Sequence, residues 1–285
     1  MTRHPTLAKR AEQLLGRPVV STAPVSGGDV ATTTKLRLSD GTTAAMKTLG
    51  QPAPGMFERE AAGLRWLGEA ERGVEVAEVL AVSEDALVLR WIEPGRSSAD
   101  AAAAFGRGLA RTHAAGAPAF GAPADGWIAT LPLPNAAAPT WAEFYAVRRV
   151  LPYLRLARDR GAIEPGPAGD VEAVVGRLGA LLPEEPPARV HGDLWGGNVV
   201  WGTDRAWLID PAAYGGHREV DLALLSLFGL PHLHRALEAY DDTTPLAQGW
   251  QDRIGVHQLF PLLVHACLFG GGYGARAGEV AARYR

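Results

Sequence analysis

Residues 191–210 decide the fold of this chain and read His-Gly-Asp-Leu-Trp-Gly-Gly-Asn-Val-Val-Trp-Gly-Thr-Asp-Arg-Ala-Trp-Leu-Ile-Asp. In this stretch Asp193 is followed five positions later by Asn198, and Asp210 closes the run. Two short apolar segments, 199–201 and 206–209, flank the turn residues 202–205, which is typical of a β-hairpin. Such a hairpin would return Asp210 to the side of Asn198.

These three polar residues are the parts that phosphoryl transfer from ATP requires. The reaction needs a carboxylate facing the acceptor hydroxyl and two oxygen ligands for a Mg²⁺ ion that bridges the phosphates. The spacing also matches the kinase catalytic loop, H-R-D followed by four residues and Asn, with Gly192 in the place of Arg. A single turn Asp is more often a cap or a backbone-bonding residue, but three polar residues at this spacing favour a phosphotransferase site. We therefore expect Asp193 to act as general base, or to orient the acceptor hydroxyl, and Asn198 and Asp210 to bind Mg²⁺.

The chain upstream of this stretch is β-rich in its first third and helical afterwards. The hydrophobic periodicity predicts helices over 6–15 and 56–71 and strands over 19–25, 30–38, 42–49, 76–82 and 86–92. Glu93-Pro94-Gly95 breaks the chain, and almost everything beyond it, apart from the hairpin, has a helical pattern. This layout predicts an α+β, two-lobed, protein-kinase-like fold. We expect a nucleotide-binding lobe over residues 1–92 and a catalytic and substrate-binding lobe over 93–285.

Several residues of the first lobe are candidate ATP contacts. Gly27 and Gly28 lie between two predicted strands, where glycines let backbone N–H groups approach phosphates, although a plain hairpin turn is an alternative. Lys47 ends the run Ala44-Ala45-Met46-Lys47, which resembles the V-A-I-K strand of kinases; a solvated edge lysine is the alternative. By position, the backbone near Arg90 and Ile92 would pair with adenine.

A helix carboxylate is expected to hold that lysine in place. Glu60 shares a helix face with Leu64 and Leu67, the face that should pack on the sheet. Glu58 falls on a different face, because residues two apart on a helix do not point the same way. We therefore expect Glu60 to be the partner of Lys47.

Composition gives the class of protein but not its chemistry. The 285 residues are 47% hydrophobic and 21% charged, with a net charge of −3. These values are ordinary for a soluble globular protein and give no reason to expect nucleic acid or an anionic membrane as a partner. No apolar run approaches the roughly 18 residues of a membrane span, and Cys267 is the only cysteine, as in proteins of reducing compartments. We expect a cytoplasmic protein.

Four segments of the chain resemble the fructosamine/ketosamine-3-kinase family, a branch of the aminoglycoside-phosphotransferase-like and choline-kinase-like superfamily. They are residues 56–60, 191–198, 210–223 and 258–273, so the resemblance spans nearly the whole chain. Its specific marks are Trp195 inside the catalytic loop and the run Gly-His-Arg-Glu-Val-Asp at 216–221. Pro-Ala follows Asp210 where protein kinases have Phe-Gly, and no A-P-E segment follows, which argues against a protein kinase.

The resemblance implies an ATP- and Mg²⁺-dependent kinase that phosphorylates O3 of ketosamines, either small glycated amines or glycated protein lysines, and so promotes deglycation. Trp195 would then offer a flat face to the sugar, unless it is an ordinary core residue. His217 would line the acceptor pocket or brace a loop, and Asp221 would bond to the catalytic-loop backbone. Two other functions stay open: a related kinase for an aminoglycoside, choline or homoserine-like alcohol, and a non-catalytic ATP-binding protein.

Overall fold

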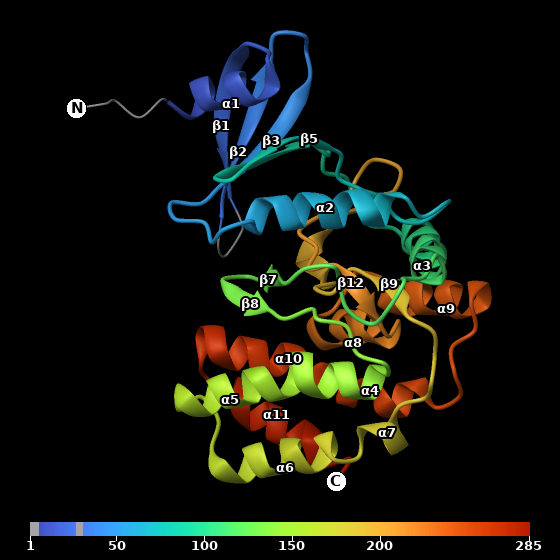
Figure 1. The fold of residues 1–285 in the computed structure, drawn as a ribbon. Coiled ribbons are helices and arrows are strands. Elements are labelled where there is room, and N and C mark those ends of the chain that lie inside the picture. The colour runs from blue at the N-terminus through green and yellow to red at the C-terminus, as the bar shows by residue number, and fades with distance from the viewer. Residues whose placement is uncertain (1–5, 27–30) are drawn as a thin grey trace.

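The computed structural model describes residues 6–26 and 31–285 and begins with a five-stranded antiparallel sheet (Figure 1). The sheet has the order β1-β2-β3-β6-β5. Its strands are β1 (Val19–Val25), β2 (Thr32–Leu38), β3 (Thr43–Thr48), β5 (Val79–Ser83) and β6 (Ala86–Arg90). A turn at Ser39-Asp40-Gly41 joins β2 to β3, with the Thr42 N–H donating to the Asp40 carboxylate at 2.9 Å.

Two helices cover the two faces of this sheet. Side chains of α1 (Leu7–Leu15) pack with one set of strand residues, including Met46 and Val88. Side chains of α2 (Met56–Gly68) pack with the alternate set, including Leu87 and Leu89. Successive residues of a strand point to opposite faces, so the apolar β6 is buried on both sides.

One predicted strand is wrong, because residues 76–82 divide into two elements. Only β5 belongs to the five-stranded sheet, whereas the two residues of β4 (Glu75–Val76) pair in parallel with β11 (Ala206–Leu208). The Ala77 N–H extends this contact by donating to the Leu208 carbonyl at 3.0 Å. A strand of the first part of the chain therefore completes a sheet of the second part.

The second part of the chain is mainly helical, as expected. Its long helices are α3 (Ala99–Ala114), α8 (Glu219–Phe228), α9 (Leu233–Thr243), α10 (Trp250–Phe269) and α11 (Tyr273–Ala281). The others are α4 (Trp141–Phe144), the π-helix η1 (Tyr145–Val150), α5 (Leu151–Asp159), α6 (Pro165–Val175) and α7 (Leu178–Leu181). A large apolar core surrounds α10, and a second core joins α3 and α9 to the β-hairpin of residues 199–208, called the catalytic hairpin below. No helix in residues 6–26 and 31–285 is long and apolar enough to span a bilayer.

Three short sheets interrupt this helical part. The predicted hairpin is present as β10 (Val199–Trp201) and β11, preceded by the 3₁₀ turn η2 (Gly196–Asn198). The other two sheets have no counterpart in the predicted helical pattern: β7 (Gly126–Ile128) pairs with β8 (Leu131–Leu133), and β9 (Ala188–Val190) pairs with β12 (Tyr214–Gly216). Figure 1 shows β7 and β8 between α2 and α10. The α+β architecture, an antiparallel sheet followed by a helical part, is confirmed.

Candidate active site

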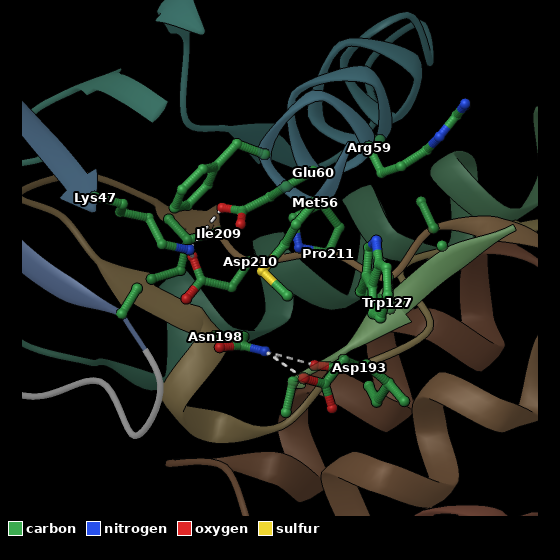
Figure 2. A pocket seen from close by; sticks show the side chains of 18 of the residues that line it. Lys47, Met56, Arg59, Glu60, Trp127, Asp193, Asn198, Ile209, Asp210 and Pro211 are labelled. Atoms are coloured by element: carbon green, nitrogen blue, oxygen red, sulfur yellow. Dashed lines mark hydrogen bonds and ion pairs between the residues drawn. The ribbon is translucent and has the colours of Figure 1, made fainter. Parts of the chain in front are cut away.

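A cavity of about 920 Å³ lies between the five-stranded sheet, α2 and the catalytic hairpin. It is lined by eight of the residues expected at the site: Lys47, Glu60, Arg90, Ile92, Asp193, Trp195, Asn198 and Asp210. Figure 2 shows Lys47, Glu60 and Asp210 grouped on one side of this space, with Asn198 and Asp193 below them. Gly27 and Gly28, expected near the phosphates, lie outside the described residues.

Lys47 is held by two carboxylates from distant parts of the chain. Its Nζ lies 2.7 Å from Glu60 Oε1 and 2.9 Å from Asp210 Oδ1, and the residue is only 9% exposed. Burial acts to lower the pKa of Lys47, but the charges of Asp210 and Glu60 outweigh it and hold that pKa above its usual value. The lysine is therefore a fixed cation. The expected Lys47–Glu60 pair is present, and Glu58 is exposed on another face of α2.

Glu60 shares its cation with Asp210, and this has an electrostatic cost. Burial raises the pKa of Glu60 to about 7; the attraction of Lys47 opposes that change and the charge of Asp210 adds to it. Two carboxylates around one ammonium leave an excess of negative charge, which a further cation beside Asp210 would relieve.

The catalytic loop is fixed from behind by Asp221, as the resemblance implied. The His191 N–H donates to Asp221 Oδ2 at 2.7 Å and the Gly192 N–H donates to Oδ1 at 2.9 Å. His113 Nε2 lies 3.0 Å from the same Oδ2, and Asp221 is fully buried. Gly192 has φ +81°, and a Cβ there would lie 2.3 Å from the Ala212 carbonyl oxygen. Glycine is therefore the residue that fits where the kinase loop has Arg.

Asn198 and Asp210 are brought together by the β10–β11 hairpin. The Ile209 N–H donates to the Asn198 carbonyl at 3.1 Å, next to Asp210, which has the left-handed φ of 56°. Asn198 Nδ2 donates to the Asp193 carbonyl at 2.8 Å and to Asp193 Oδ2 at 3.3 Å. The amide oxygen of Asn198 is therefore left as an acceptor beside the Asp210 carboxylate. These hard oxygen donors fit Mg²⁺, which binds few protein ligands and keeps several waters.

Asp193 has the environment of a base poised near neutral pH. Burial raises the pKa of Asp193 to about 7, the charge of Asp210 acts in the same direction, and the bond from Asn198 opposes both. A general base is most effective when its pKa lies near the working pH. The carboxylate lines the cavity, so it can reach a hydroxyl bound there.

Of the two residues predicted to lie near adenine, Arg90 and Ile92, only Ile92 has a backbone N–H that the described part of the chain leaves free to bind a ligand. The Arg90 N–H donates to the Glu78 carbonyl at 2.8 Å, and its side chain pairs with the Glu78 carboxylate. The N–H of Arg90 is thus already used by the sheet. No hydrogen bond within residues 6–26 and 31–285 engages the Ile92 N–H, so this donor is available to a ligand.

Trp195 lies at the cavity, whereas His217 does not. The indole of Trp195 is 38% exposed and makes an edge contact with Phe228 at a centroid distance of 6.3 Å. His217 is fully buried and lies outside the cavity lining. It stacks on His257 at 5.0 Å, and its Nδ1 accepts the Glu219 N–H at 3.2 Å. This packing favours the loop-bracing role of His217 over contact with an acceptor.

In the described part of the chain, His217, Glu219 and His257 form the one cluster whose atoms are close enough to hold a metal ion. The ring protons argue against that function. His217 Nδ1 accepts the Glu219 N–H, and His257 Nε2 accepts from Trp141 Nε1 at 3.1 Å. Each neutral imidazole therefore carries its proton on the nitrogen that a metal would need. Arg253 also holds both oxygens of Glu219, at 2.6 and 3.0 Å.

Sequence reasoning missed Trp127, which lines the same cavity from β7 (Figure 2). It lies across the view from Lys47, below Arg59 of α2, which also lines the space. A signal was present, because Asp125-Gly126 is a turn dipeptide directly before an aromatic residue. The strands that follow are too short for an alternating pattern to show.

Comparison with known proteins agrees with this geometry. A family model described as fructosamine kinase matches residues 4–284. A protein of Thermus thermophilus named as a probable ketoamine kinase is 37% identical over 88% of each chain. The crystal structure of a candidate fructosamine-3-kinase from Thermobifida fusca is 46% identical, covers 98% of each chain and has a TM-score of 0.93. An ADP-bound aminoglycoside phosphotransferase shares the fold, with a TM-score of 0.61, 12% identity and 97% coverage of each chain.

Proposed function

We propose, since the chain belongs to the fructosamine kinase family, that this ATP-dependent phosphotransferase transfers the γ-phosphate of ATP to O3 of a ketosamine. A ketosamine is a sugar joined through its C1 to an amine, such as a lysine side chain. The observation that carries the proposal is the meeting of Asp193, Asn198 and Asp210 in one cavity with the exposed indole of Trp195.

In this proposal the nucleotide lies along the N-terminal side of the cavity. Lys47 neutralises charge on the α- and β-phosphates, and Glu60 keeps its ammonium in position. The free Ile92 N–H would donate to adenine. The Asp210 carboxylate and the amide oxygen of Asn198 would hold Mg²⁺, which when bound neutralises charge that develops on the phosphates.

Asp193 is the proposed base for the sugar hydroxyl. It would accept the O3 proton as O3 attacks the γ-phosphorus and the bond to ADP breaks. Asp221 bonds to the loop backbone at His191 and Gly192, which would restrict the positions open to the neighbouring Asp193 carboxylate. Trp195 would lie against the sugar, because an indole face packs well against C–H groups.

The proposed product explains why such a reaction would free a glycated amine. A phosphate on C3 is a good leaving group beside the C2 carbonyl. Its elimination as inorganic phosphate, with loss of a proton from C1, would leave an imine between C1 and the amine nitrogen. Hydrolysis of that imine by water would release the free amine and a dicarbonyl sugar that lacks the C3 oxygen. A site that binds the sugar and leaves the amine side open would accept both small glycated amines and protein lysines.

The test is phosphorus NMR of the product formed from ATP and a synthetic ribulosamine or fructosamine. We expect one new phosphomonoester, on O3. If no sugar is phosphorylated, or if another oxygen carries the phosphate, the acceptor is a different alcohol and the proposal is wrong. Inhibition of this turnover by EDTA, with recovery on adding Mg²⁺, would support the proposed metal requirement.

The base is tested with Asp193→Asn, which should lower kcat by about 10²–10⁴-fold and leave the affinity for ATP nearly unchanged. Asp204→Asn is the matched control, because Asp204 is exposed in the turn of the same hairpin and pairs with Arg205. The assignment of Asp193 would be refuted by a variant that keeps more than a tenth of the wild-type rate.

A further inference from the structure

The β7–β8 hairpin carries Trp127 into the cavity on the side away from Lys47 (Figure 2). The hairpin is three residue pairs long, and Trp127 is paired with Pro132. Ala129, in the turn, has φ 51°, a left-handed conformation that costs free energy for any residue with a Cβ. So short a hairpin is not stable by itself, and its position must be fixed by what lies behind it.

Arg149 provides that support from the π-helix η1. Its Nη1 donates to the Pro134 carbonyl at 2.6 Å, and its Nη2 donates to Asn135 Oδ1 at 2.6 Å. The guanidinium lies 3.9 Å from the ring centroid of Tyr214 and 4.6 Å from that of Phe144.

The charge of Arg149 is fully buried, and no carboxylate in the described residues pairs with it. A buried charge without a counter-ion is costly.

Asn135 also bonds to the N-terminal end of the hairpin segment. Its N–H donates to Asp125 Oδ1 at 2.7 Å, and its Nδ2 donates to the Ala124 carbonyl at 3.3 Å. The two ends of the segment 124–135 are therefore tied together, and Arg149 is bonded to one of them. A π-helix, a buried unpaired cation and a left-handed alanine are each uncommon and costly, and features of this kind gather where function requires them.

The charged side chains that line the cavity determine which group could bind a cationic amine. In the described residues, the carboxylates that line the cavity are Glu60, Asp193 and Asp210, and the lysine and arginines that line it are Lys47, Arg59 and Arg90. Arg59 is exposed, and its guanidinium points away from Trp127 in Figure 2. Glu60 and Asp210 hold Lys47, and Asp193 has the role of base. A ketosamine has a protonated secondary amine at C1, and no further carboxylate in this lining is available to that cation.

An indole face attracts an ammonium group. Among the other indoles of the lining, Trp66 already faces Arg189, Trp91 faces Lys35, and Trp195 is assigned to the sugar. In the described residues, Trp127 is the lining indole on the side away from Lys47 that has no such cation over its ring.

We propose that Trp127 is a specificity-determining residue that receives the cationic amine of the acceptor, and that Arg149 is the positioning residue that holds its hairpin. This inference rests on the proposed function, because it assigns the amine side of a ketosamine. It predicts that a cationic acceptor is preferred to a neutral one of the same shape, and that Trp127 is the cause of the preference.

The experiment compares a ketosamine with its ether analogue, in which an oxygen replaces the amine nitrogen on C1, so that the shape is kept and the positive charge is lost. For the wild type we expect the KM of the ketosamine to be at least tenfold lower than that of the analogue. Trp127→Ala should raise the KM of the ketosamine about tenfold and leave the KM of the analogue and of ATP within twofold, while Trp127→Phe should lie between. Thr130→Ala, an exposed change on the same hairpin outside the cavity lining, is the matched control.

The outcomes separate this inference from the proposed function. If the wild type phosphorylates neither compound, the proposed function fails. If it phosphorylates the ketosamine but Trp127→Ala raises both acceptor KM values equally, Trp127 only packs against the sugar and the inference is overturned. An unchanged KM in Trp127→Ala overturns it as well.

The positioning role is tested with Arg149→Lys and with Asp125→Ala, which removes the acceptor of the Asn135 N–H at the surface. Both should raise the KM of the ketosamine at least threefold with the KM of ATP unchanged, in protein that is folded by circular dichroism. If Arg149→Lys does not fold, Asp125→Ala decides the matter. If the KM values of ATP and ketosamine rise equally, or if neither rises, the contacts of Arg149 and Asn135 stabilise the fold but do not position Trp127.

Discussion

Replacing Asp221 by Asn tests how much of the active site depends on one buried carboxylate. The carboxylate accepts the backbone N–H groups of His191 and Gly192 and contacts His113 Nε2. An amide keeps one acceptor oxygen and replaces the other with an NH₂ group. In either orientation of the amide, one loop N–H therefore meets a donor in place of an acceptor.

The size of the effect follows from these contacts. A hydrogen bond to a charged group contributes about 1.5–3 kcal/mol, and a buried donor left without a partner costs about 1–3 kcal/mol. We therefore expect Asp221→Asn to lower the free energy of unfolding by roughly 3–5 kcal/mol, a large part of the 5–15 kcal/mol typical of proteins. Because the loop also positions Asp193, kcat should fall by about 10²-fold, as expected for a displacement near 1 Å.

Urea unfolding, followed by tryptophan fluorescence, gives the change in the free energy of unfolding, and steady-state kinetics give the change in kcat. Asp242→Asn is the control, because Asp242 is an exposed carboxylate of α9. If Asp221→Asn unfolds within 1 kcal/mol of the wild type (about fivefold in the folding equilibrium) and keeps its kcat within twofold, the bonds to the loop do not have the assigned importance.

Two further predictions concern the cavity, and a third concerns the buried His217 behind it. Glu60→Gln should lower kcat about tenfold, because Lys47 loses a charged partner, whereas Glu58→Gln should change kcat little; the reverse order would contradict the assigned helix face. Asp210→Ala should abolish the Mg²⁺-dependent part of ATP affinity, measured by calorimetry with and without EDTA. A variant whose dissociation constant for ATP in Mg²⁺ equals that of the wild type would refute this assignment. Burial lowers the pKa of His217 to about 4, below the 6.5 of an unfolded histidine, so the unfolded state takes up the proton first as pH falls. This residue should therefore lower the free energy of unfolding by up to about 3 kcal/mol between pH 6.5 and pH 4. His217→Asn should reduce this dependence on pH, as measured by urea unfolding at several pH values. An unchanged dependence would contradict the prediction.

The sequence predicts best where local pattern and chemistry agree. The Lys47–Glu60 pair follows from a strand lysine and a helix face, and both are visible in short windows of sequence. The β10–β11 hairpin follows from two apolar runs around a turn. In each case the interacting residues lie close in sequence, or the motif that joins them has a fixed spacing.

The parts that could not be predicted depend on contacts between distant segments. Nothing near Arg149 in the sequence indicates that a charged side chain is buried among aromatic rings. The pairing of β4 with β11 joins residues that lie 132 positions apart in the sequence, Glu75 with Trp207 and Val76 with Leu208. His217 is similar, because its burial against His257 is set by α10 and not by its neighbours in sequence.

The pairing of β4 with β11 also has a consequence for the order in which a newly made chain can fold. The ribosome releases residues 75–76 long before residues 206–208. Until then β4 has no strand to pair with, and the Ala77 N–H lacks its acceptor, the Leu208 carbonyl. Over the same interval Lys47 has Glu60 but not Asp210. A nascent or truncated chain would thus have the lysine of the site without the proposed metal ligands. Binding of a nucleotide with its metal ion would therefore become possible only after residue 210 has been made.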